Sequence, residues 1–498
     1  MCIYTQLRFI NSSKAEKNMR IALISLLSSE QLRAKQTGWH TFNDLEPYGL
    51  ECIAAVAKEN GHETRLFHPY QSKNPSEEAI AKEATEYKPN VLAISAYTNS
   101  FPRSVAIAQT VKSRIPSVKI VVGGDHITSF PENLLGNRII DLAVIGEGET
   151  TFGQLLDSNF ENLDIPGLAY LKDGALKLTP WRNRVRDRGI FPRALRDGEI
   201  MAKSRVGSLM YPAPSKQTGT ASVMLNFGCP LGCTYCTETT VGKGKVGKRN
   251  ADDVVRELGE LKQNFGTNTA MFLDLTFNLY SNQAEELCKR LAKANLGVNW
   301  YGMIRVTSPN GTQRVKPSLL EAMASAGASK IAFGIESTEP EAIKDYHRSV
   351  SIQQDECALR EIDRIGVLSK VLLIIGHPEE KRDYYDSLIN HLKILTPDEV
   401  RISFITPFPG TELWKNKVKT GEWSLTSRDW SEYTTFNQVV EMNYIGQREL
   451  DTQRRRILRA YYSSPEFERH LRNKVSANPH LEQSYKEFLE VLKVQKVI

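Results

Sequence analysis

Residues 226–236 read Asn226-Phe227-Gly228-Cys229-Pro230-Leu231-Gly232-Cys233-Thr234-Tyr235-Cys236, with cysteines spaced Cys-x3-Cys-x2-Cys. They follow an apolar run at residues 222–226, which predicts a strand that ends at this loop. Three thiolates on a tight, glycine-containing loop suit an iron–sulfur cluster or zinc. Structural zinc takes four ligands, and the other four cysteines lie far away in the sequence. The pattern therefore indicates a metal centre and favours a cluster over structural zinc.

Strand and helix patterns alternate from this loop toward the C-terminus. Strands are predicted at residues 222–226, 269–274, 298–304, 330–335, 370–375 and 399–406, with helices at 251–264, 281–294, 316–326, 353–365 and 383–394. Six strands with helices between them predict a partial parallel (β/α)6 barrel over residues 218–415. Residues 416–498 turn polar and predict a mostly helical C-terminal region, in which Trp423, Trp430 and Tyr433 form either part of a core or an apolar lid.

The N-terminal part predicts a second α/β unit. Strands are expected at residues 21–26, 63–67, 91–95, 119–122 and 142–145, and helices at 50–60, 76–87, 103–115 and 131–135. Five strands joined by helices predict a doubly wound domain over residues 19–157, preceded at residues 1–18 by a tail or a mis-called start. Ligands of such domains bind at the carboxyl ends of the strands, where residues 95–98, 123–126 and 146–149 form loops here.

Residues 158–217 connect the two units. Their segment 181–197 holds six arginines and two aspartates. This composition predicts a basic interdomain linker, and the alternative is a patch for an anionic ligand or nucleic acid.

Composition narrows the class of protein further. The 498 residues include 64 lysines and arginines against 58 acidic residues, and a net charge of +6 is too dilute to indicate a nucleic-acid partner. Seven cysteines, three of them in one loop, fit a reducing compartment better than disulfide pairs. No apolar stretch reaches the ~18 residues of a membrane helix, and residues 1–18 lack the apolar core of a secretory signal. We therefore expect a cytoplasmic protein without a membrane partner.

The cysteine spacing, with Tyr235 before the last cysteine, resembles that of the radical S-adenosylmethionine superfamily. Segments 272–277, 304–306, 333–337, 375–380 and 406–411 are similar to that family's barrel strands. The N-terminal glycine loops resemble those of its cobalamin-binding members, whose first domain is flavodoxin-like. The resemblance covers about residues 19–462.

This resemblance implies three cofactors: one (4Fe–4S) cluster, S-adenosylmethionine and cobalamin. Cys229, Cys233 and Cys236 would hold the cluster as catalytic and metal-binding residues. The residues implied in binding S-adenosylmethionine are Tyr235, Asp274, Arg305, Glu336 and Ser337. Those implied in binding cobalamin are Tyr48, Gly49, Ser95, Tyr97, Thr98, Gly123, Gly124, His126, Gly146, Glu147, Gly148 and Glu149.

The chain also departs from the family pattern. Many cobalamin proteins carry Asp-x-His-x-x-Gly, of which only His40 is present here, so we expect cobalamin to bind without a protein histidine ligand. On the second barrel strand, the acidic pair that is usual in the family is changed to Asp274-Leu275. After Pro378, Glu379 replaces the glycine that the family pattern has.

The resemblance implies a radical methylase that acts on an unactivated carbon of a small-molecule metabolite. The alternative keeps both cofactors for a radical rearrangement, cyclisation or oxidation without methyl transfer. A non-catalytic cobalamin or iron–sulfur carrier is a more distant alternative. A methylthiotransferase would need three further N-terminal cysteines, and only Cys2 and Cys52 are present. The expected partners are the substrate and an electron donor such as flavodoxin or ferredoxin.

Overall fold

The computed structural model describes residues 18–26, 45–68, 76–207, 209–307, 311, 313–348, 352–446 and 449–498. His40, Cys2 and nearly all of the predicted N-terminal tail lie outside these residues. The chain divides into two compact units, the first comprising Met1–Leu27, Pro47–Ile200 and Thr240–Gly242, and the second comprising Ser28–Glu46, Met201–Thr239 and Lys243–Ile498. Each unit is described by itself.

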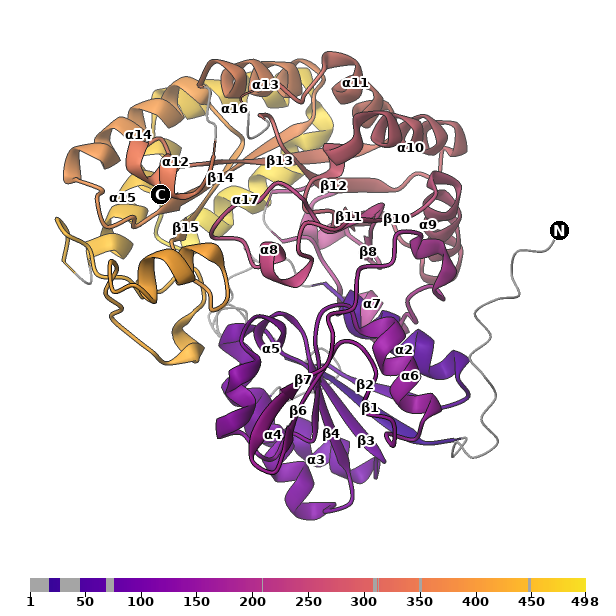
Figure 1. The fold of residues 1–498 in the computed structure, drawn as a ribbon. Helices are drawn as coiled ribbons and strands as arrows, with labels where there is room; N and C mark the ends of the chain where they lie inside the picture. The colour runs from indigo at the N-terminus through magenta and orange to yellow at the C-terminus, as the bar shows by residue number, and fades with distance from the viewer. Residues whose placement is uncertain are drawn as a thin grey trace. The chain divides into compact units, whose positions relative to one another are not determined.

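The first unit is built on a seven-stranded sheet of order β2-β1-β3-β4-β5-β6-β7 (Figure 1). The strands are β1 (Arg20–Ser25), β2 (Glu63–Phe67), β3 (Val91–Ser95), β4 (Lys119–Gly123), β5 (Leu142–Val144), β6 (Leu168–Lys172) and β7 (Ala175–Leu178). The first five are parallel, and the order 2-1-3-4-5 is that of flavodoxin-like folds. The prediction of a doubly wound domain is therefore confirmed.

Helices cover both faces of this sheet. They are α2 (Tyr48–Glu59), α3 (Glu77–Glu86), α4 (Phe101–Arg114), α5 (Asp125–Ser129) and α6 (Gly148–Asp157). The apolar faces of α3 and α4 join one core with the sheet, and α2 packs against α6. Helix α3 begins after Ser76, whose hydroxyl accepts a hydrogen bond from the Ala79 amide at 3.2 Å. The helix predicted at residues 131–135 is instead a 3-10 helix, η2 (Pro131–Gly136).

The segment predicted as a linker supplies the last two strands of the sheet. Strands β6 and β7 pair antiparallel and turn at Asp173 and Gly174, whose φ angles are +52° and +76°. An Asp-Gly pair with two positive φ angles is a favoured two-residue hairpin turn. Strand β6 pairs with β5, so this hairpin extends the first unit instead of connecting the two units.

The second unit contains a six-stranded parallel sheet of order β15-β14-β13-β12-β11-β8. Its strands are β8 (Ala221–Val223), β11 (Thr269–Phe272), β12 (Asn299–Ile304), β13 (Ala328–Glu336), β14 (Leu368–Ile375) and β15 (Glu399–Phe404). Between them run α9 (Ala251–Phe265), α10 (Ser281–Ala294), α11 (Pro317–Ser325), α12 (Pro340–Asp345), α13 (Ile352–Arg364) and α14 (Arg382–Leu395). The six predicted strands are confirmed, and β8 and β15 are the two edges of a partial barrel.

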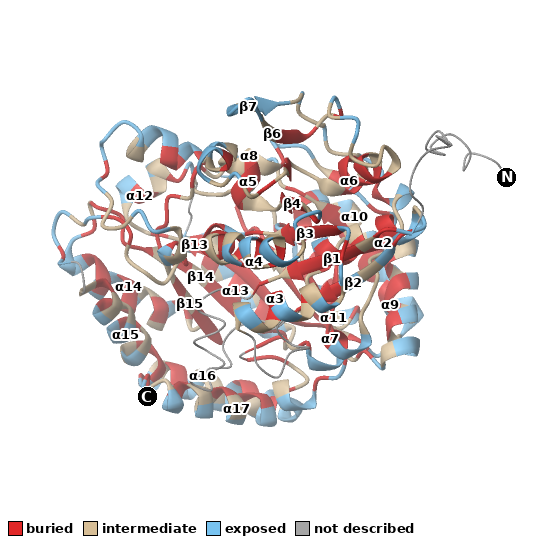
Figure 2. Cartoon of the chain, turned by 90° about the horizontal axis from the view of Figure 1, so that it is seen from below, coloured by how far each residue is buried: buried red, intermediate tan, exposed pale blue. Residues whose placement is uncertain are grey.

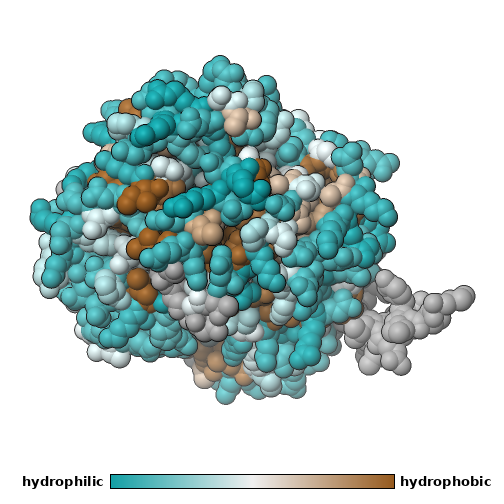
Figure 3. Space-filling model, turned by 90° about the horizontal axis from the view of Figure 1, so that it is seen from above, coloured by the Kyte–Doolittle hydropathy of each residue, from teal (hydrophilic) through white to brown (hydrophobic). Residues whose placement is uncertain are grey.

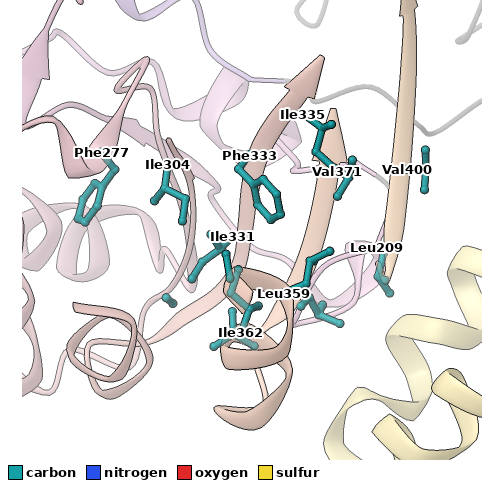
Figure 4. Packing of buried hydrophobic residues seen from close by; sticks show 14 of the residues in the cluster. Leu209, Phe277, Ile304, Ile331, Phe333, Ile335, Leu359, Ile362, Val371 and Val400 are labelled. Carbon is teal, nitrogen blue, oxygen red and sulfur yellow. The ribbon is translucent and has the colours of Figure 1, made fainter. Parts of the chain in front are cut away.

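The core of this unit lies between the strands and their covering helices. Phe333, Ile335 and Val371 point from neighbouring strands toward Leu359 and Ile362 of α13 (Figure 4). Because side chains alternate along a strand, every second residue faces the inside of the barrel instead. The strands are largely buried, whereas the covering helices alternate between buried and exposed residues (Figure 2).

Three helices close the chain: α15 (Glu449–Tyr462), α16 (Pro465–Ala477) and α17 (Glu482–Val494). They confirm the helical C-terminal region, and their aromatic side chains join the barrel core. Trp423 and Tyr433 are 6% and 1% exposed and form a smaller core with Trp414, so they are not an exposed lid. Hydrophilic residues dominate the face in Figure 3, and no helix among the described residues is long and apolar enough to cross a membrane.

Candidate active site

The three cysteines of the predicted metal loop follow β8 and the short strand β9 (Asn226–Phe227). All three are free thiols with half-buried side chains. Gly228 and Gly232 have φ angles of +95° and +69°, which favour glycine and let the chain turn tightly between the cysteines.

The loop is held in place by distant parts of the barrel. The Thr234 hydroxyl donates a hydrogen bond to the carbonyl of Asp345, at the end of α12, at 2.6 Å. The Thr234 carbonyl accepts one from the amide of Leu413 at 2.9 Å. These contacts leave the thiols available on a loop whose backbone is fixed.

The environment of the thiols fits a metal cluster. Burial, with smaller contributions from the charges of Cys233 and Cys229, raises the pKa of Cys236 to about 12. Ligand thiols must be deprotonated, and three neighbouring thiolates repel one another unless iron ions offset their charge. Among the described residues, no three His, Cys, Asp or Glu side chains lie close enough together to hold a metal ion as they stand. The cluster ligands therefore stay a prediction, supported by spacing and shared environment.

Arg305 lies beside the cysteine loop, at the end of β12. Its Nη1 donates to Cys233 Sγ at 3.3 Å and its Nε donates to the Thr307 carbonyl at 2.8 Å. The side chain of Asn278 bonds to both the amide and the carbonyl of Arg305, at 2.9 Å each. The remaining nitrogen, Nη2, is buried without a hydrogen-bond partner among the described residues. A buried guanidinium nitrogen of this kind suits a carboxylate such as that of a methionyl group.

Glu336 ends β13 in a strained conformation. Its φ angle is +68°, and a bulge shifts the pairing with β14 between Gly334 and Glu336. The carboxylate folds back over Gly334, where a Cβ atom would lie 2.0 Å from Glu336 Oε1. Strain of this kind persists where the surrounding structure imposes it, and it is common at ligand sites.

Arg348 belongs to this group although no sequence motif pointed to it. Its Nη2 donates to the Gly334 carbonyl at 2.5 Å and lies 3.9 Å from Glu336 Oε1. It also hydrogen bonds to Cys233, and the charges of Glu336 and Cys233 raise the pKa of its guanidinium. Two arginines, Arg305 and Arg348, therefore converge on one cysteine, which suits the negative charge of a thiolate-bound cluster.

Tyr235 is close to the same group. Burial, the carboxylate of Glu336 and Cys233 raise the pKa of its phenol well above 10. Its ring packs edge-to-face on Tyr346, with centroids 5.2 Å apart. The phenol therefore stays neutral and the ring is packed in place, and its contact with adenine stays a prediction.

Two residues predicted to bind S-adenosylmethionine also form hydrogen bonds within the protein. Asp274 is fully buried and accepts hydrogen bonds from the amides of Leu225 and Asn226 at 2.9 and 2.7 Å. Ser337 is also buried, bonds to the Tyr384 hydroxyl at 3.1 Å and accepts from a backbone amide before α12. Their contact with the cofactor stays a prediction, and the structure gives both a positioning role.

The glycine loops of the first unit gather at the carboxyl ends of β3, β4 and β5, as predicted. The Ala96 amide donates to the Gly123 carbonyl at 2.9 Å, and the Gly146 amide donates to Thr128 Oγ1 at 3.1 Å. Gly124 has a φ angle of +96°, and a Cβ there would lie 2.8 Å from the Ala96 carbonyl oxygen. The close approach of these loops therefore requires glycine at position 124.

Other predicted cobalamin residues lie around these loops in differing surroundings. Tyr97 is 60% exposed beyond β3, Thr98 is buried, and Ser95 ends the strand half-buried. Tyr48 and Gly49 begin α2, and the guanidinium of Arg196 lies 5.0 Å from the centroid of the Tyr48 ring. Their contacts with cobalamin stay predictions.

His126 has a structural environment. It is 1% exposed, and its ring nitrogens contact Thr98 Oγ1 at 3.2 Å and Asn133 Nδ2 at 3.0 Å. Burial lowers its pKa to about 4, so the imidazole is neutral at pH 7. Both nitrogens have partners inside the domain, so His126 helps to hold the loop, and its predicted contact with cobalamin stays a prediction.

The arginine-rich segment 181–197 folds onto the first unit. Arg184 Nε lies 2.7 Å from Glu147, and the guanidinium of Arg188 contacts both Glu147 and Glu149. Arg196 pairs with Glu51 at 2.8 Å, where both side chains are buried. These arginines neutralise buried carboxylates, which differs from both a solvated linker and an open patch. Glu147 and Glu149 were predicted beside cobalamin, and their carboxylates are used in these pairs.

Comparison with known families supports both units. Residues 39–156 match the B12 binding domain, and residues 223–392 match the Radical SAM superfamily. An uncharacterized methyltransferase of Pyrococcus horikoshii is 27% identical over 84% of this chain and 88% of its own length. The hopanoid C-3 methylase of Methylococcus capsulatus is 23% identical over 80% of this chain and 73% of its own. An anaerobic magnesium-protoporphyrin IX monomethyl ester cyclase of Rubrivivax gelatinosus is 23% identical over 74% of this chain and 66% of its own length.

Solved structures share the fold. A radical S-adenosylmethionine methyltransferase from Kitasatospora setae, solved with cobalamin and an iron–sulfur cluster, superposes with a TM-score of 0.65 at 16% identity. That likeness covers 82% of this chain and 80% of the other. The cobalamin-dependent S-adenosylmethionine radical enzyme OxsB gives a TM-score of 0.68 at 15% identity, covering 94% of this chain and 72% of the other.

Proposed function

We propose that this chain, which belongs to the family of cobalamin-dependent radical S-adenosylmethionine enzymes, methylates an unactivated carbon of a small-molecule metabolite. The observation that carries this proposal is the presence of both cofactor domains in one chain, each with its loops at the carboxyl ends of parallel strands. The relative from Pyrococcus horikoshii, similar over most of both chains, is named a methyltransferase. A carrier protein would not need the buried cations and the strained carboxylate beside the cysteine loop.

When bound, the cluster and S-adenosylmethionine supply a carbon radical, and cobalamin carries the methyl group. The protein binds and orients these groups. Arg305 Nη2 would bind the methionyl carboxylate, and Glu336, held by Arg348, would accept hydrogen bonds from the ribose hydroxyls. Tyr235 would pack on the adenine. Cys229, Cys233 and Cys236 would hold the iron.

A second function is supported by one observation. The relative from Rubrivivax gelatinosus, 23% identical over 74% of this chain, is named a cyclase. A protein similar to most of this chain is therefore named for ring formation. A cytoplasmic location and an electron donor such as flavodoxin or ferredoxin belong to either proposal.

The two functions differ in how much S-adenosylmethionine they consume. A methylase uses one molecule to methylate cobalamin and another to form the radical. We therefore expect near-equal amounts of S-adenosylhomocysteine and 5′-deoxyadenosine from anaerobically reconstituted enzyme turning over its substrate. Label from methyl-deuterated S-adenosylmethionine should appear in the product by mass spectrometry.

Two cysteine variants provide the controls. Cys233→Ala should lose the iron and both products, whereas Cys357→Ala, an exposed cysteine outside the loop, should retain them. Formation of 5′-deoxyadenosine and product without labelled methyl would refute methyl transfer and leave rearrangement, cyclisation or oxidation.

A further inference from the structure

Three arginines from different parts of the chain lie around the cysteine loop. Arg305 follows β12, Arg314 precedes α11 and Arg348 follows α12. The guanidinium groups of Arg305 and Arg348 both donate hydrogen bonds to Cys233 Sγ, the first at 3.3 Å. Arg314 lies close enough to Cys229 for the charge of that thiol to act on the pKa of its guanidinium. Folding therefore collects three cations beside two of the three predicted iron ligands.

Uncharged acceptors hold two of these arginines. Arg305 donates to the carbonyl of Thr307 at 2.8 Å, in addition to its bond to the cysteine sulfur. Arg314 donates to the carbonyls of Asn278 and Leu279 at 3.3 and 2.6 Å. The hydrogen-bond acceptors of both arginines in the described part of the chain are therefore backbone carbonyls and a sulfur, and none is a carboxylate.

Each of the three guanidinium groups also keeps one buried nitrogen that has no hydrogen-bond partner among the described residues. These nitrogens are Nη2 of Arg305, Nε of Arg314 and Nε of Arg348. Burial and the charge of Arg305 lower the pKa of Arg314, so the two cations are close enough to repel each other. Neighbouring buried charges of one sign are unfavourable unless an anion lies with them. An iron–sulfur cluster held by three thiolates is such an anion.

The carboxylates near the loop are distributed differently. Glu336 lies 3.9 Å from Arg348 and is the close counter-ion of that arginine. Asp355 is 4% exposed, and burial raises its pKa to about 7, so it carries only part of a charge at neutral pH. Burial, and in smaller part the charge of Glu238, raises the pKa of Cys236. Positive charge is therefore concentrated around the other two cysteines.

We propose that Arg305, Arg314 and Arg348 raise the reduction potential of the iron–sulfur cluster. Reduction takes one electron from the external donor, a flavodoxin or ferredoxin, and makes the charge of the cluster more negative by one unit. Cations nearby, and hydrogen bonds to the ligand sulfurs, favour that added charge. This inference rests on the proposed function for its premise that the three cysteines of the loop hold the cluster.

The test is a redox titration of the reconstituted full chain, followed by electron paramagnetic resonance of the reduced cluster. It is done without S-adenosylmethionine, so that altered binding of this cofactor does not contribute. Removing a unit charge within about 10 Å, at an effective dielectric constant of about 20, changes the ratio of reduced to oxidised cluster about tenfold. This change is a shift of about 59 mV for one electron.

Arg348→Met and Arg314→Met should each lower the potential by about this amount. Arg348→Lys and Arg314→Lys keep the positive charge and should restore most of the wild-type potential. Glu336→Gln removes a negative charge of similar shape and should move the potential in the opposite direction. Arg360→Met changes a 77% exposed side chain on α13 and should leave the potential unchanged.

Iron content and absorption near ~400 nm establish that the cluster is present in each variant. If Arg348→Met fails to hold iron, Arg314→Met and Glu336→Gln still decide, because neither removes a hydrogen bond to Cys233. A general disturbance of the fold does not predict shifts of opposite sign for these two variants.

Two results would overturn the proposal. One is a ratio of reduced to oxidised cluster within about twofold of the wild type in both arginine variants, with the cluster intact. The other is a shift of Glu336→Gln in the same direction as the arginine variants. The titration requires no substrate, so it is independent of the methyl-label experiment. Labelled product with unchanged potentials would refute only the role of the arginines, and shifted potentials without labelled product would refute only methyl transfer.

Discussion

Arg305→Met tests the proposed cofactor site most directly. The substitution removes the guanidinium and leaves an unbranched side chain of similar length in the buried position. The Asn278 contacts use the backbone of residue 305 and are retained. The protein loses the bonds from Nε to the Thr307 carbonyl and from Nη1 to Cys233 Sγ, at a cost of about 1.5 to 3 kcal/mol each in stability. The apolar core of the barrel is untouched, so the barrel should still fold.

The expected loss of affinity for S-adenosylmethionine follows from Nη2 of Arg305, which has no hydrogen-bond partner among the described residues. A charge-assisted hydrogen bond from Nη2 to the methionyl carboxylate contributes about 1.5 to 3 kcal/mol. The dissociation constant for S-adenosylmethionine should therefore rise about 10- to 150-fold. Arg305→Lys keeps the positive charge without the planar guanidinium. Its dissociation constant for S-adenosylmethionine should lie between those of the wild type and Arg305→Met.

Anaerobic titration calorimetry of the reconstituted protein measures this change. Iron content and absorption near ~400 nm establish that the cluster is still present in each variant. Arg360→Met, on the exposed face of α13, is the matched control and should bind S-adenosylmethionine like the wild type. A dissociation constant of Arg305→Met within about twofold of the wild type, with the cluster intact, would refute the assignment of Arg305 to the carboxylate.

Two further predictions concern buried charges. Arg188→Met removes the cation paired with Glu149, whereas Glu147 keeps its pairing with Arg184. The substitution should lower the stability of the cobalamin-binding unit by about 3 to 5 kcal/mol in calorimetric unfolding, and Arg114→Met, at an exposed residue, should not. An unchanged melting temperature would contradict this reasoning. Burial raises the pKa of Asp274 from 3.8 to about 7. Between these two pH values the native state holds a proton that the unfolded chain releases. The free energy of unfolding should therefore fall by up to about 4 kcal/mol as pH rises from about 4 to 7. Asp274→Asn should flatten that slope in unfolding curves measured across this range, and an identical slope would show that other groups cause it.

Local patterns were sufficient for much of the architecture. The alternating apolar runs predicted five parallel strands in the first unit and six in the second, because strand and helix periodicity depend on neighbours a few residues apart. The cysteine spacing likewise lies within eight residues, so the candidate metal loop could be recognised without a fold. The Asp173-Gly174 turn of β6 and β7 is a local feature, but the pairing of β6 with β5 depends on residues more than twenty positions away.

The roles of individual charged residues depended on the tertiary structure. Arg348 has no motif around it, and it joins the site only because the chain after α12 returns to Gly334 and Cys233. Asp274 was predicted beside S-adenosylmethionine, and only the fold shows that it also accepts hydrogen bonds from two backbone amides, since the strand before the cysteine loop passes beside it.

The sequence by itself determined the fold class, the two α/β units and the cysteine loop, because these depend on periodicity and spacing along the chain, and its resemblance to a known family implied the cofactors. Only the tertiary structure decided which charges are paired. It placed Arg188 between Glu147 and Glu149, and it placed Glu399 between Lys330 and Lys370. The physical reason is that a buried charge depends on partners brought together by folding from distant parts of the chain, and no local pattern records them.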